Sequence, residues 1–549
     1  MTRSHEPKIL ELLPPQRQLS PAIAKSIENL LDTLRQDPTK QHLLNNANKG
    51  RAQIQAFMTK MHSDANGVPF STFDAFVKRH SESWTNHVKD AEKMNDKAQI
   101  DKRKLLAPSL GQHKLSGIDI RVGKGRAPDD KVYQESDYAR NHMPRGNFLL
   151  SYPSLAIDSG EVIVHYFPVI RGYPKFTGQE DDHHVKENIA SEFFSKPIEK
   201  AKHVVVTRKE NGEAAHLAVL KTIQNEYIFA IGSKNTHFLV SNMEEIKVAC
   251  CQDISECRAY RAALPLGTAI LQMIENLAQE SREMLCEFLW QTQTTACFEV
   301  LCPSHQHVEP LDHLLTDTPL FYALSFPDLE PSAGTKIAMN PVLPFLFMEL
   351  CEVQTVPFYM IDFDVANRHI LTDSVRSAHG FEGVVNIFLD DELNVIGIEK
   401  VKTNWYVCLR AIREKAKTFW GKFCEEEKRK KELIDKAAGD ASKRVENHVS
   451  TSEEAKDVSD RVEKKDLLSE TAKNISNRIR NIQRFTKMSD EMCHTFQRLG
   501  KEFIEYIHSN GVAEERKIGL RHSLADHFPI VWKKFLQDTG NREAIKILI

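Results

Sequence analysis

HVVVTRKENGE, residues 203–213, joins a run of β-branched residues to a lysine and an Asn-Gly pair. The run from Val204 to Thr207 predicts a buried strand. Asn211 and Gly212 predict a tight turn, because both residues tolerate positive φ. Lys209 is therefore expected at the mouth of a strand, where a turn brings backbone close to a phosphate. A lysine beside other cations or in a dry pocket loses its proton more easily, which makes it a nucleophile.

Two segments downstream place a single charged residue on or beside an apolar strand. Lys234 follows the predicted strand Tyr227–Ile231 and lies on a hairpin of the same sheet. Glu299 interrupts the apolar strand Ala296–Leu301. A buried carboxylate costs free energy unless it is paired or functional. Both residues are therefore candidates for a site around Lys209.

Two later strands add one carboxylate and two lysines. Glu382 stands directly before the predicted strand Val384–Leu389. Lys400 and Lys402 end the predicted strand that begins near Asn394, and residues two apart on a strand point to the same face. A single lysine pair on a strand is usually solvated, so the interpretation depends on the whole ordered set.

Nucleotidyl transfer is the chemistry that this set of residues favours. A lysine amine attacks the α-phosphate of a nucleoside triphosphate and forms a covalent phosphoramidate. Lys400 and Lys402 would neutralise the phosphate charge, with Mg²⁺ helping in the transition state. Glu299 and Glu382 would bind the ribose hydroxyls or hold the metal ion.

Five elements in this order resemble the ATP-dependent RNA ligases of the covalent nucleotidyltransferase superfamily. The similarity is greatest to the phage tRNA-repair ligases and to the fungal and plant tRNA-splicing ligases, and it spans roughly residues 135–410. The last element is the most specific and favours RNA ligases over DNA ligases or capping enzymes. The matching elements are Lys209-Glu-Asn-Gly212, Ser233-Lys234, Phe298-Glu299, Glu382-Gly-Val-Val385 and Lys400-Val-Lys402-Thr403-Asn-Trp405-Tyr406.

Upstream, the same ligases carry an Arg-Gly strand and a Pro-Lys-Phe segment. Arg145-Gly146 and Pro174-Lys175-Phe176 match them, although Arg171-Gly172 is a second candidate for the arginine. The chain departs from the phage pattern after Phe176 and at Glu213, where the phage pattern has Ser. These departures concern substrate positioning more than nucleotide chemistry.

The resemblance implies an enzyme that uses ATP and Mg²⁺ (or Mn²⁺) to join RNA ends. Lys209 would carry AMP, with Lys400 and Lys402 as further catalytic residues. The AMP would pass to an RNA 5'-phosphate, and a 3'-hydroxyl would then seal the strand, with tRNA as a candidate substrate. The implied nucleotide-binding residues are Arg145, Lys175, Gly212, Lys234, Glu299 and Glu382, and Glu382 is also the candidate Mg²⁺ contact.

Two other functions stay open at this point. One is a related enzyme that stops after adenylation or guanylation, and the other is an inactive homologue that binds RNA. No β-rich domain is recognisable after Lys402, which argues against capping enzymes and DNA ligases. The intact set of lysines and glutamates argues against an inactive homologue.

Composition and charge describe a globular chain without a membrane span. Charged residues make up 27% and the net charge is −3, so an RNA partner needs a local basic surface. No window of about 18 apolar residues is present, and the N-terminus lacks a signal-peptide pattern. The 10 cysteines are scattered, which predicts reduced thiols in the cytosol or nucleus. We expect a monomer.

One local cluster, Cys297, Cys302, His305 and His307, invites comparison with a zinc site. Zinc sites of this kind space their ligands as Cys-x₂₋₄-Cys and His-x₃₋₅-His, which this segment does not. Cys297 also alternates with Phe298 on a predicted core strand. We therefore favour an ordinary core strand and loop here.

The periodicity predicts an α+β fold with a nucleotidyltransferase domain between two helical domains. Residues 1–115 are expected to be helical, with a third helix that continues into the charged stretch near Lys104. Residues 116–415 are expected to hold antiparallel sheets and one long helix over 268–290. Residues 416–549 are expected to form a helical C-terminal domain. Its charged stretch 425–470 favours a solvated helix with a flanking linker, while Lys428–Lys431, as a nuclear-import or RNA-contact patch, and the cations near Arg480 are alternatives to a purely solvated face.

Overall fold

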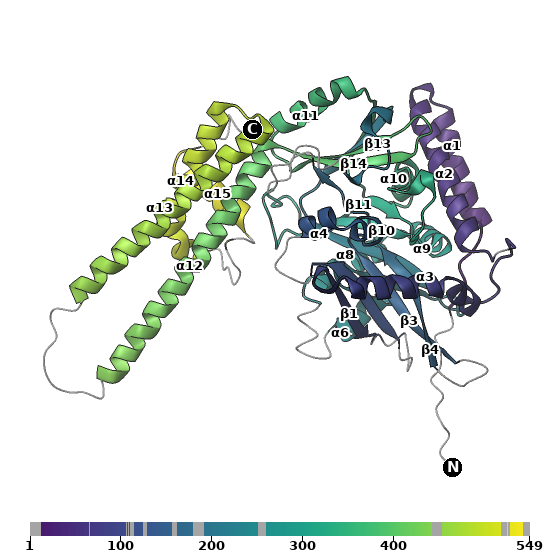
Figure 1. Ribbon diagram of the computed structural model, residues 1–549, viewed down its shortest axis with the longest axis horizontal. Helices are drawn as coiled ribbons and strands as arrows, with labels where there is room; N and C mark the ends of the chain where they lie inside the picture. Colours follow the sequence, from purple (N-terminus) through teal and green to yellow (C-terminus); the bar gives the residue numbers. More distant parts are fainter. Residues whose placement is uncertain are drawn as a thin grey trace, which may run out of the picture.

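Three largely antiparallel sheets form the body of the protein (Figure 1). The computed structural model describes residues 12–541 with gaps at 65, 106, 108, 110–114, 124–128, 156–161, 179–191, 251–259, 442–452, 518–523 and 525–526. Mixed helices and antiparallel sheets agree with the predicted α+β class. The strands predicted from period-two patterns are present, apart from their ends at 156–157 and 161, which lie outside the described residues.

The first sheet has four strands in chain order. Its strands are β1 (Ala98–Lys104), β2 (Ser116–Val122), β3 (Asn147–Leu155) and β4 (Val162–Arg171). The expectation that helix continues to Lys104 is wrong, because the stretch from Ala98 pairs antiparallel with β2. Strand pairing of this kind is a tertiary contact that a charged sequence does not reveal.

The other two sheets have five strands each and carry most of the predicted site residues; Arg145 and Lys175 flank strands of the first sheet. The second sheet has the order β11-β10-β7-β8-β9 and the third has the order β12-β6-β13-β14-β5. The strands of the second sheet are β7 (Glu213–Lys221), β8 (Tyr227–Ser233), β9 (His237–Val240), β10 (Thr295–Leu301) and β11 (Thr318–Ser325). Those of the third are β5 (Thr177–Gly178), β6 (His203–Lys209), β12 (Phe358–Asp362), β13 (Gly383–Leu389) and β14 (Val395–Lys402).

Three N-terminal helices share the core of the sheets. They are α1 (Pro21–Arg35), α2 (Gln41–Met61) and α3 (Phe73–Lys93). Ser20 caps α1, because its hydroxyl accepts a hydrogen bond from Ile23 N. Ile23 and Phe76 belong to the same buried cluster as Val205 and Leu217. The boundary drawn at 115/116 therefore falls between the paired strands β1 and β2 and does not separate two cores.

Shorter helices pack between and over the sheets. The predicted helix 268–290 is two helices, α8 and α9, because Leu277 adopts extended backbone and ends the first one. The described helices of this region are α4 (Asp129–Glu135), α5 (Asp137–His142), α6 (Met243–Cys250), α8 (Ala263–Asn276), α9 (Gln279–Thr292), α10 (Val342–Leu350) and α11 (Arg368–Ser377).

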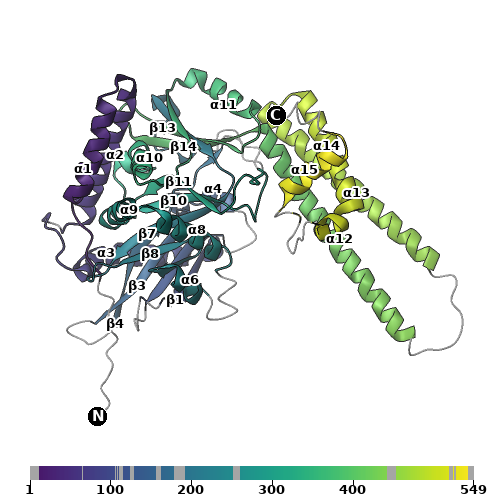
Figure 2. The same cartoon turned by 180° about the vertical axis from the view of Figure 1, so that it is seen from behind.

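The C-terminal helices form a projecting bundle on the side of the molecule opposite α1 and α2 (Figures 1 and 2). They are α12 (Asn404–Ala441), α13 (Glu453–Thr486), α14 (Asp490–Lys517) and α15 (Phe528–Asp538). Their core already includes Tyr406 and Ile412, together with Phe419 and Phe496. The boundary at 415/416 thus cuts α12 inside one packed core, and the bundle begins where β14 ends. Part of the predicted solvated stretch, 442–452, and the Lys431 side chain lie outside the described residues.

Candidate active site

The register of the third sheet brings Lys209 and Lys402 to either side of one glycine. Gly383 on β13 is opposite Lys209 on β6 and opposite Lys402 on β14. Residues directly opposite on antiparallel strands point to the same face. A Cβ on Gly383 would lie 2.1 Å from Val401 O. The φ of Gly383, 153°, is also rarely adopted by residues with side chains. Glycine therefore keeps the two lysine-bearing strands in place.

Glu382 is the carboxylate that both lysines share. Its Oε1 lies 3.2 Å from Lys209 Nζ and 3.6 Å from Lys402 Nζ, and its side chain is buried. Burial alone would raise the pKa of Glu382, but Lys209 and Lys402 together hold this pKa below its usual value. The carboxylate is therefore ionised at the centre of the cluster.

Lys209 is held as a cation, which corrects the expectation of an easily deprotonated amine. Burial alone would lower the pKa of Lys209, but the nearby carboxylates of Glu382 and Glu299 raise it above its ordinary value. Sequence reasoning placed cations next to this lysine and did not foresee that anions would be closer. The amine can act as a nucleophile only after this carboxylate charge is compensated.

Asn211 and Gly212 fix the segment after Lys209, although not through the positive φ that the sequence suggested. Neither is among the described residues with positive φ. The Asn211 amide donates to Glu382 Oε2 (2.9 Å) and Tyr406 Oη (3.0 Å), and its oxygen accepts from Val308 N (3.0 Å). Glycine is needed at 212 because a Cβ would lie 2.3 Å from Val300 O. The segment is therefore shaped by close packing against β10.

Glu299 and Lys234 come to the same pocket from the second sheet. Glu299 Oε1 accepts a hydrogen bond from Gly212 N at 3.1 Å. Burial raises the pKa of Glu299, and Lys209 opposes this effect. Lys234 follows β8 at a hairpin and lines the pocket. The two sheets thus face each other across the Lys209 amine.

Arg145 and Lys175 complete the cationic wall of the pocket. Lys175 is buried and paired with Asp130; burial, with help from Arg145 and Lys400, lowers its pKa to about 7. Arg145 Nε is buried and lacks a hydrogen-bond partner among the described residues. A buried donor of this kind suits an anionic ligand.

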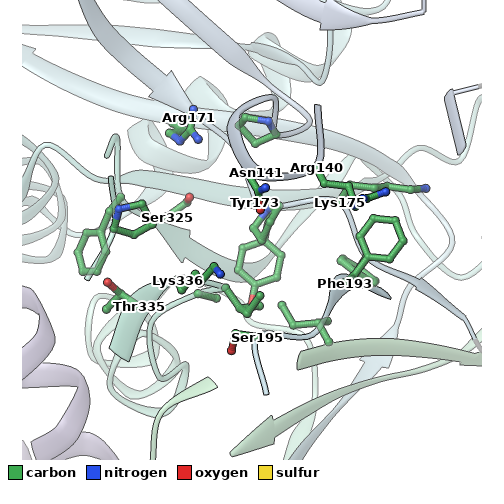
Figure 3. Close-up of a pocket in the computed structure, with 18 of the residues that line it drawn as sticks. Arg140, Asn141, Arg171, Tyr173, Lys175, Phe193, Ser195, Ser325, Thr335 and Lys336 are labelled. Atoms are coloured by element: carbon green, nitrogen blue, oxygen red, sulfur yellow. The ribbon is translucent and has the colours of Figure 1, made fainter. Parts of the chain in front are cut away.

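Arg171, the second candidate arginine, faces a different cavity. This neighbouring cavity of about 300 Å³ lies across the segment 173–176, which lines both spaces. Figure 3 shows Arg171 and Lys175 on opposite sides of Tyr173 in that cavity. Arg171 is buried and donates to His142 O at 3.1 Å. Arg145 is therefore the arginine that the fold brings to Lys209.

Glu309 is a site residue that sequence reasoning missed. Its carboxylate accepts a 2.5 Å hydrogen bond from Glu382 N and lies 3.4 Å from the Arg208 guanidinium. Burial raises the pKa of Glu309 to about 8, against the opposing effect of Arg208. Glu309 lies in a loop after β10, and no periodic pattern marks such a residue. Tyr406, which the sequence indicated only as part of a motif, accepts a hydrogen bond from the Asn211 amide.

The assembled pocket has the size and charge of a nucleotide site. Its volume is about 470 Å³, within the usual range of small-molecule pockets. Cations on one wall can bind phosphates, and buried carboxylates can hold a hard divalent cation or ribose hydroxyls. The lining contains Arg145, Lys175, Lys209, Gly212, Lys234, Glu299, Glu382, Lys400 and Lys402, so the fold brings together the residues that the resemblance implied for catalysis and nucleotide binding.

Comparisons with known proteins give distant structural similarity. No family model and no curated protein matches the chain. An archaeal ATP-dependent RNA ligase is similar in structure, with a TM-score of 0.33 and 14% identity over 72% of this chain and 78% of that chain. Mutants of Naegleria gruberi RNA ligase, one with ATP and Mn and one with AMP and Mn, give TM-scores of 0.26 and 11% identity over 57% of this chain and 98% of theirs. Similarity at this level does not decide the fold or the function.

A membrane span was not expected from the sequence. Among the residues that the structure describes, no helix has both the length and the apolar character to cross a bilayer.

Proposed function

We propose that this protein is an ATP-dependent RNA ligase in which Lys209 carries AMP. One observation carries the proposal: Lys209 Nζ lies at the centre of a pocket where Glu382, Lys402 and the second sheet converge. The ordered motifs and their resemblance to RNA ligases support the same function. Joining of a 5'-phosphate to a 3'-hydroxyl, with tRNA as the first substrate to test, is part of the proposal.

The pocket's own residues account for binding the triphosphate. Lys400 and Lys402 supply positive charge on one side, Lys175 joins them in its protonated form, and Arg145 adds planar donors that fit phosphate oxygens. Because Lys400 and Lys402 are fixed on strand β14, little reorganisation is needed as charge develops in the transition state. Glu299 is placed on the opposite sheet, where it would accept hydrogen bonds from ribose hydroxyls.

Proton loss from Lys209 is the step that the geometry regulates. Glu382 and Glu299 favour the charged amine, so attack requires that their effect be reduced. Glu382, whose carboxylate is ionised, would offer an oxygen ligand to a hard divalent cation such as Mg²⁺ or Mn²⁺. Such an ion, when bound, would supply positive charge beside the α-phosphate and draw carboxylate charge away from the amine.

The reaction divides into three balanced transfers. The Lys209 ammonium first loses one proton to water; the amine then forms a bond to the α-phosphorus, the bond to pyrophosphate breaks, and the nitrogen gives a second proton to water. An oxygen of the RNA 5'-phosphate then attacks the same phosphorus, and the Lys209 nitrogen leaves and takes up two protons from water to become an ammonium again. Finally a 3'-hydroxyl loses its proton, attacks the activated 5'-phosphate and releases AMP.

The experiment is incubation with labelled ATP or GTP and a divalent cation, followed by denaturing electrophoresis and mass spectrometry of the labelled peptide. We expect one AMP on Lys209, none in Lys209→Ala, and normal labelling in Lys196→Ala, whose exposed amine pairs with Asp390. A label on another lysine would contradict the site. A Lys209 adduct without joining of nicked RNA would favour the enzyme that stops at nucleotidylation, and the absence of any adduct would favour the inactive RNA-binding homologue.

A further inference from the structure

Three potential metal ligands meet at the mouth of the Lys209 pocket. Nε2 of His307 lies 3.1 Å from Glu213 Oε1, and Nε2 of His305 lies 3.8 Å from the same oxygen. One ligand atom from each residue falls within 4.8 Å of the others. Glu213 and His307 line the pocket, so the cluster borders the space assigned to the nucleotide.

The loop after β10 is built to present both histidines together. Gln306 between them is buried; its amide donates to Pro303 O at 2.9 Å and accepts from Leu311 N at 3.0 Å. The flanking histidines are partly exposed, and their ring centroids are 5.0 Å apart. With Gln306 anchored inward, His305 and His307 reach Glu213 at the start of β7.

This segment contains the core strand that the sequence predicted, with Cys297 buried on β10. Burial raises the pKa of the thiols of Cys297 and Cys302 to about 12, and neither belongs to the cluster. Glu213, which is 92 positions from His305 in the sequence, takes their place.

We propose that Glu213, His305 and His307 bind one transition-metal ion of the zinc class. Two imidazoles and one carboxylate are a ligand set that zinc uses with a fourth, open position. Bonds of 2.0–2.1 Å in a tetrahedron place ligand atoms ~3.3 Å apart, and the observed 3.1 and 3.8 Å are close to this separation. Imidazole ligands set this site apart from the oxygen-only Mg²⁺ contact at Glu382.

Arg413 gives the proposal a second, independent test. Its guanidinium donates to His307 Nδ1 at 3.3 Å, so Nδ1 accepts and Nε2 carries the proton that goes to Glu213. Metal binding at Nε2 needs the other tautomer, in which Nδ1 donates. Arg413→Gln supplies an oxygen that can accept from Nδ1, so this variant should bind the ion at least as tightly as wild type.

The decisive measurement is calorimetric titration of tag-free, full-length protein with Zn²⁺ and Co²⁺ in excess Mg²⁺, with cobalt absorption as a report on the ligands. The background carries Cys424→Ser, since this cysteine is exposed. We expect one equivalent bound with a nitrogen- and oxygen-ligand spectrum. Loss of a residue that only hydrogen-bonds to a metal ligand lowers metal affinity about 10–100-fold. His305→Ala and His307→Ala should each weaken Zn²⁺ binding by more than this, because each removes a ligand. His369→Ala, an exposed histidine on α11, should change nothing.

Glu213→Gln separates this proposal from an anion site made of the same histidines. Loss of the carboxylate should weaken Zn²⁺ binding, whereas it would strengthen binding of inorganic phosphate to an anion site. Tighter phosphate binding with unchanged Zn²⁺ binding in Glu213→Gln would overturn the proposal. It would also be overturned by a thiolate spectrum, by no saturable Zn²⁺ binding, or by binding that survives both histidine substitutions. None of these measurements depends on ligase activity.

Discussion

At the scale of single residues, the site is a balance between buried charges. Glu382 is ionised between Lys209 and Lys402, while Glu309 behind it has a pKa of about 8. Neighbouring glutamates thus differ in protonation because one has two lysines within ion-pair distance and the other is mainly desolvated. Substitution of Glu382 should therefore change the chemistry of the site, whereas substitution of Glu309 should change the pH dependence of stability.

Lys400→Ala and Lys402→Ala should each slow formation of the Lys209 adduct. Removing one preorganised charge contact costs roughly 2.7–4 kcal/mol of barrier, or about 10²–10³ in rate. The rate of AMP uptake, measured by quenched-flow labelling, checks this expectation. Lys200→Ala, outside the pocket, is the control, and near-normal rates in both strand variants would show that these lysines do not contact the phosphates.

Glu309→Gln should flatten the pH dependence of stability between pH 5 and 8. The folded state holds the Glu309 proton up to a pKa of about 8, whereas an ordinary glutamate releases it near 4.5. The folded state therefore binds more protons in this window, and stability falls as pH rises. Thermal unfolding at pH 5 and 8 should show a smaller drop in Tm for Glu309→Gln than for wild type. Glu280→Gln, at an exposed position, should behave like wild type, and parallel curves for Glu309→Gln would contradict the assignment.

At the scale of elements, strand β13 works as a spacer between two lysine-bearing strands. β6 and β14 pair with β13 on either side, and Gly383 is the residue that both lysines flank. Helix α12 then starts directly after β14 and brings Tyr406 to Asn211. The site thus depends on register, and a slip by one residue would turn the lysines to the opposite face.

Gly383→Ala should therefore reduce both stability and adenylation. The added Cβ would lie 2.1 Å from Val401 O, and backbone strain of this kind costs on the order of 1–3 kcal/mol. Gly421→Ala is the matched control, because its Cβ would meet nothing within 4 Å and alanine favours the helix. A lower Tm and slower AMP uptake in Gly383→Ala alone are expected. Equal behaviour of the two variants would mean that β13 adapts without loss of register.

At the scale of the whole molecule, the projecting bundle is a candidate surface for RNA. Arg480 and Arg484 are exposed and lie one helical turn apart on α13, so they can follow phosphates along one face. Because α12 crosses residue 415 within one core, truncation after this residue would expose buried side chains such as Ile412. Charge reversal tests the surface without that damage.

Arg480→Glu with Arg484→Glu should weaken RNA binding and leave the Lys209 adduct unchanged. Loss of two phosphate contacts should lower the slope of log affinity against log salt by about two. Binding of a nicked stem-loop RNA at several salt concentrations measures both effects. Lys25→Glu with Lys89→Glu, on α1 and α3, carries the same charge change and should bind normally. Equal affinity of the two double variants would place the RNA surface elsewhere.

The sequence by itself determined the strands that carry the lysine-centred motifs, and the α+β class, since β-branched runs, strand alternation and glycine positions are local properties. Only the tertiary structure decided what surrounds each charge. Glu382 and Glu299 reverse the expected effect on Lys209, Glu309 joins them from a loop, and Glu213 meets the two histidines. Pairing of β1 with β2 and the shared cores of the terminal helices were also beyond local patterns. The physical reason is that pKa values and core boundaries depend on distances between residues far apart in the chain.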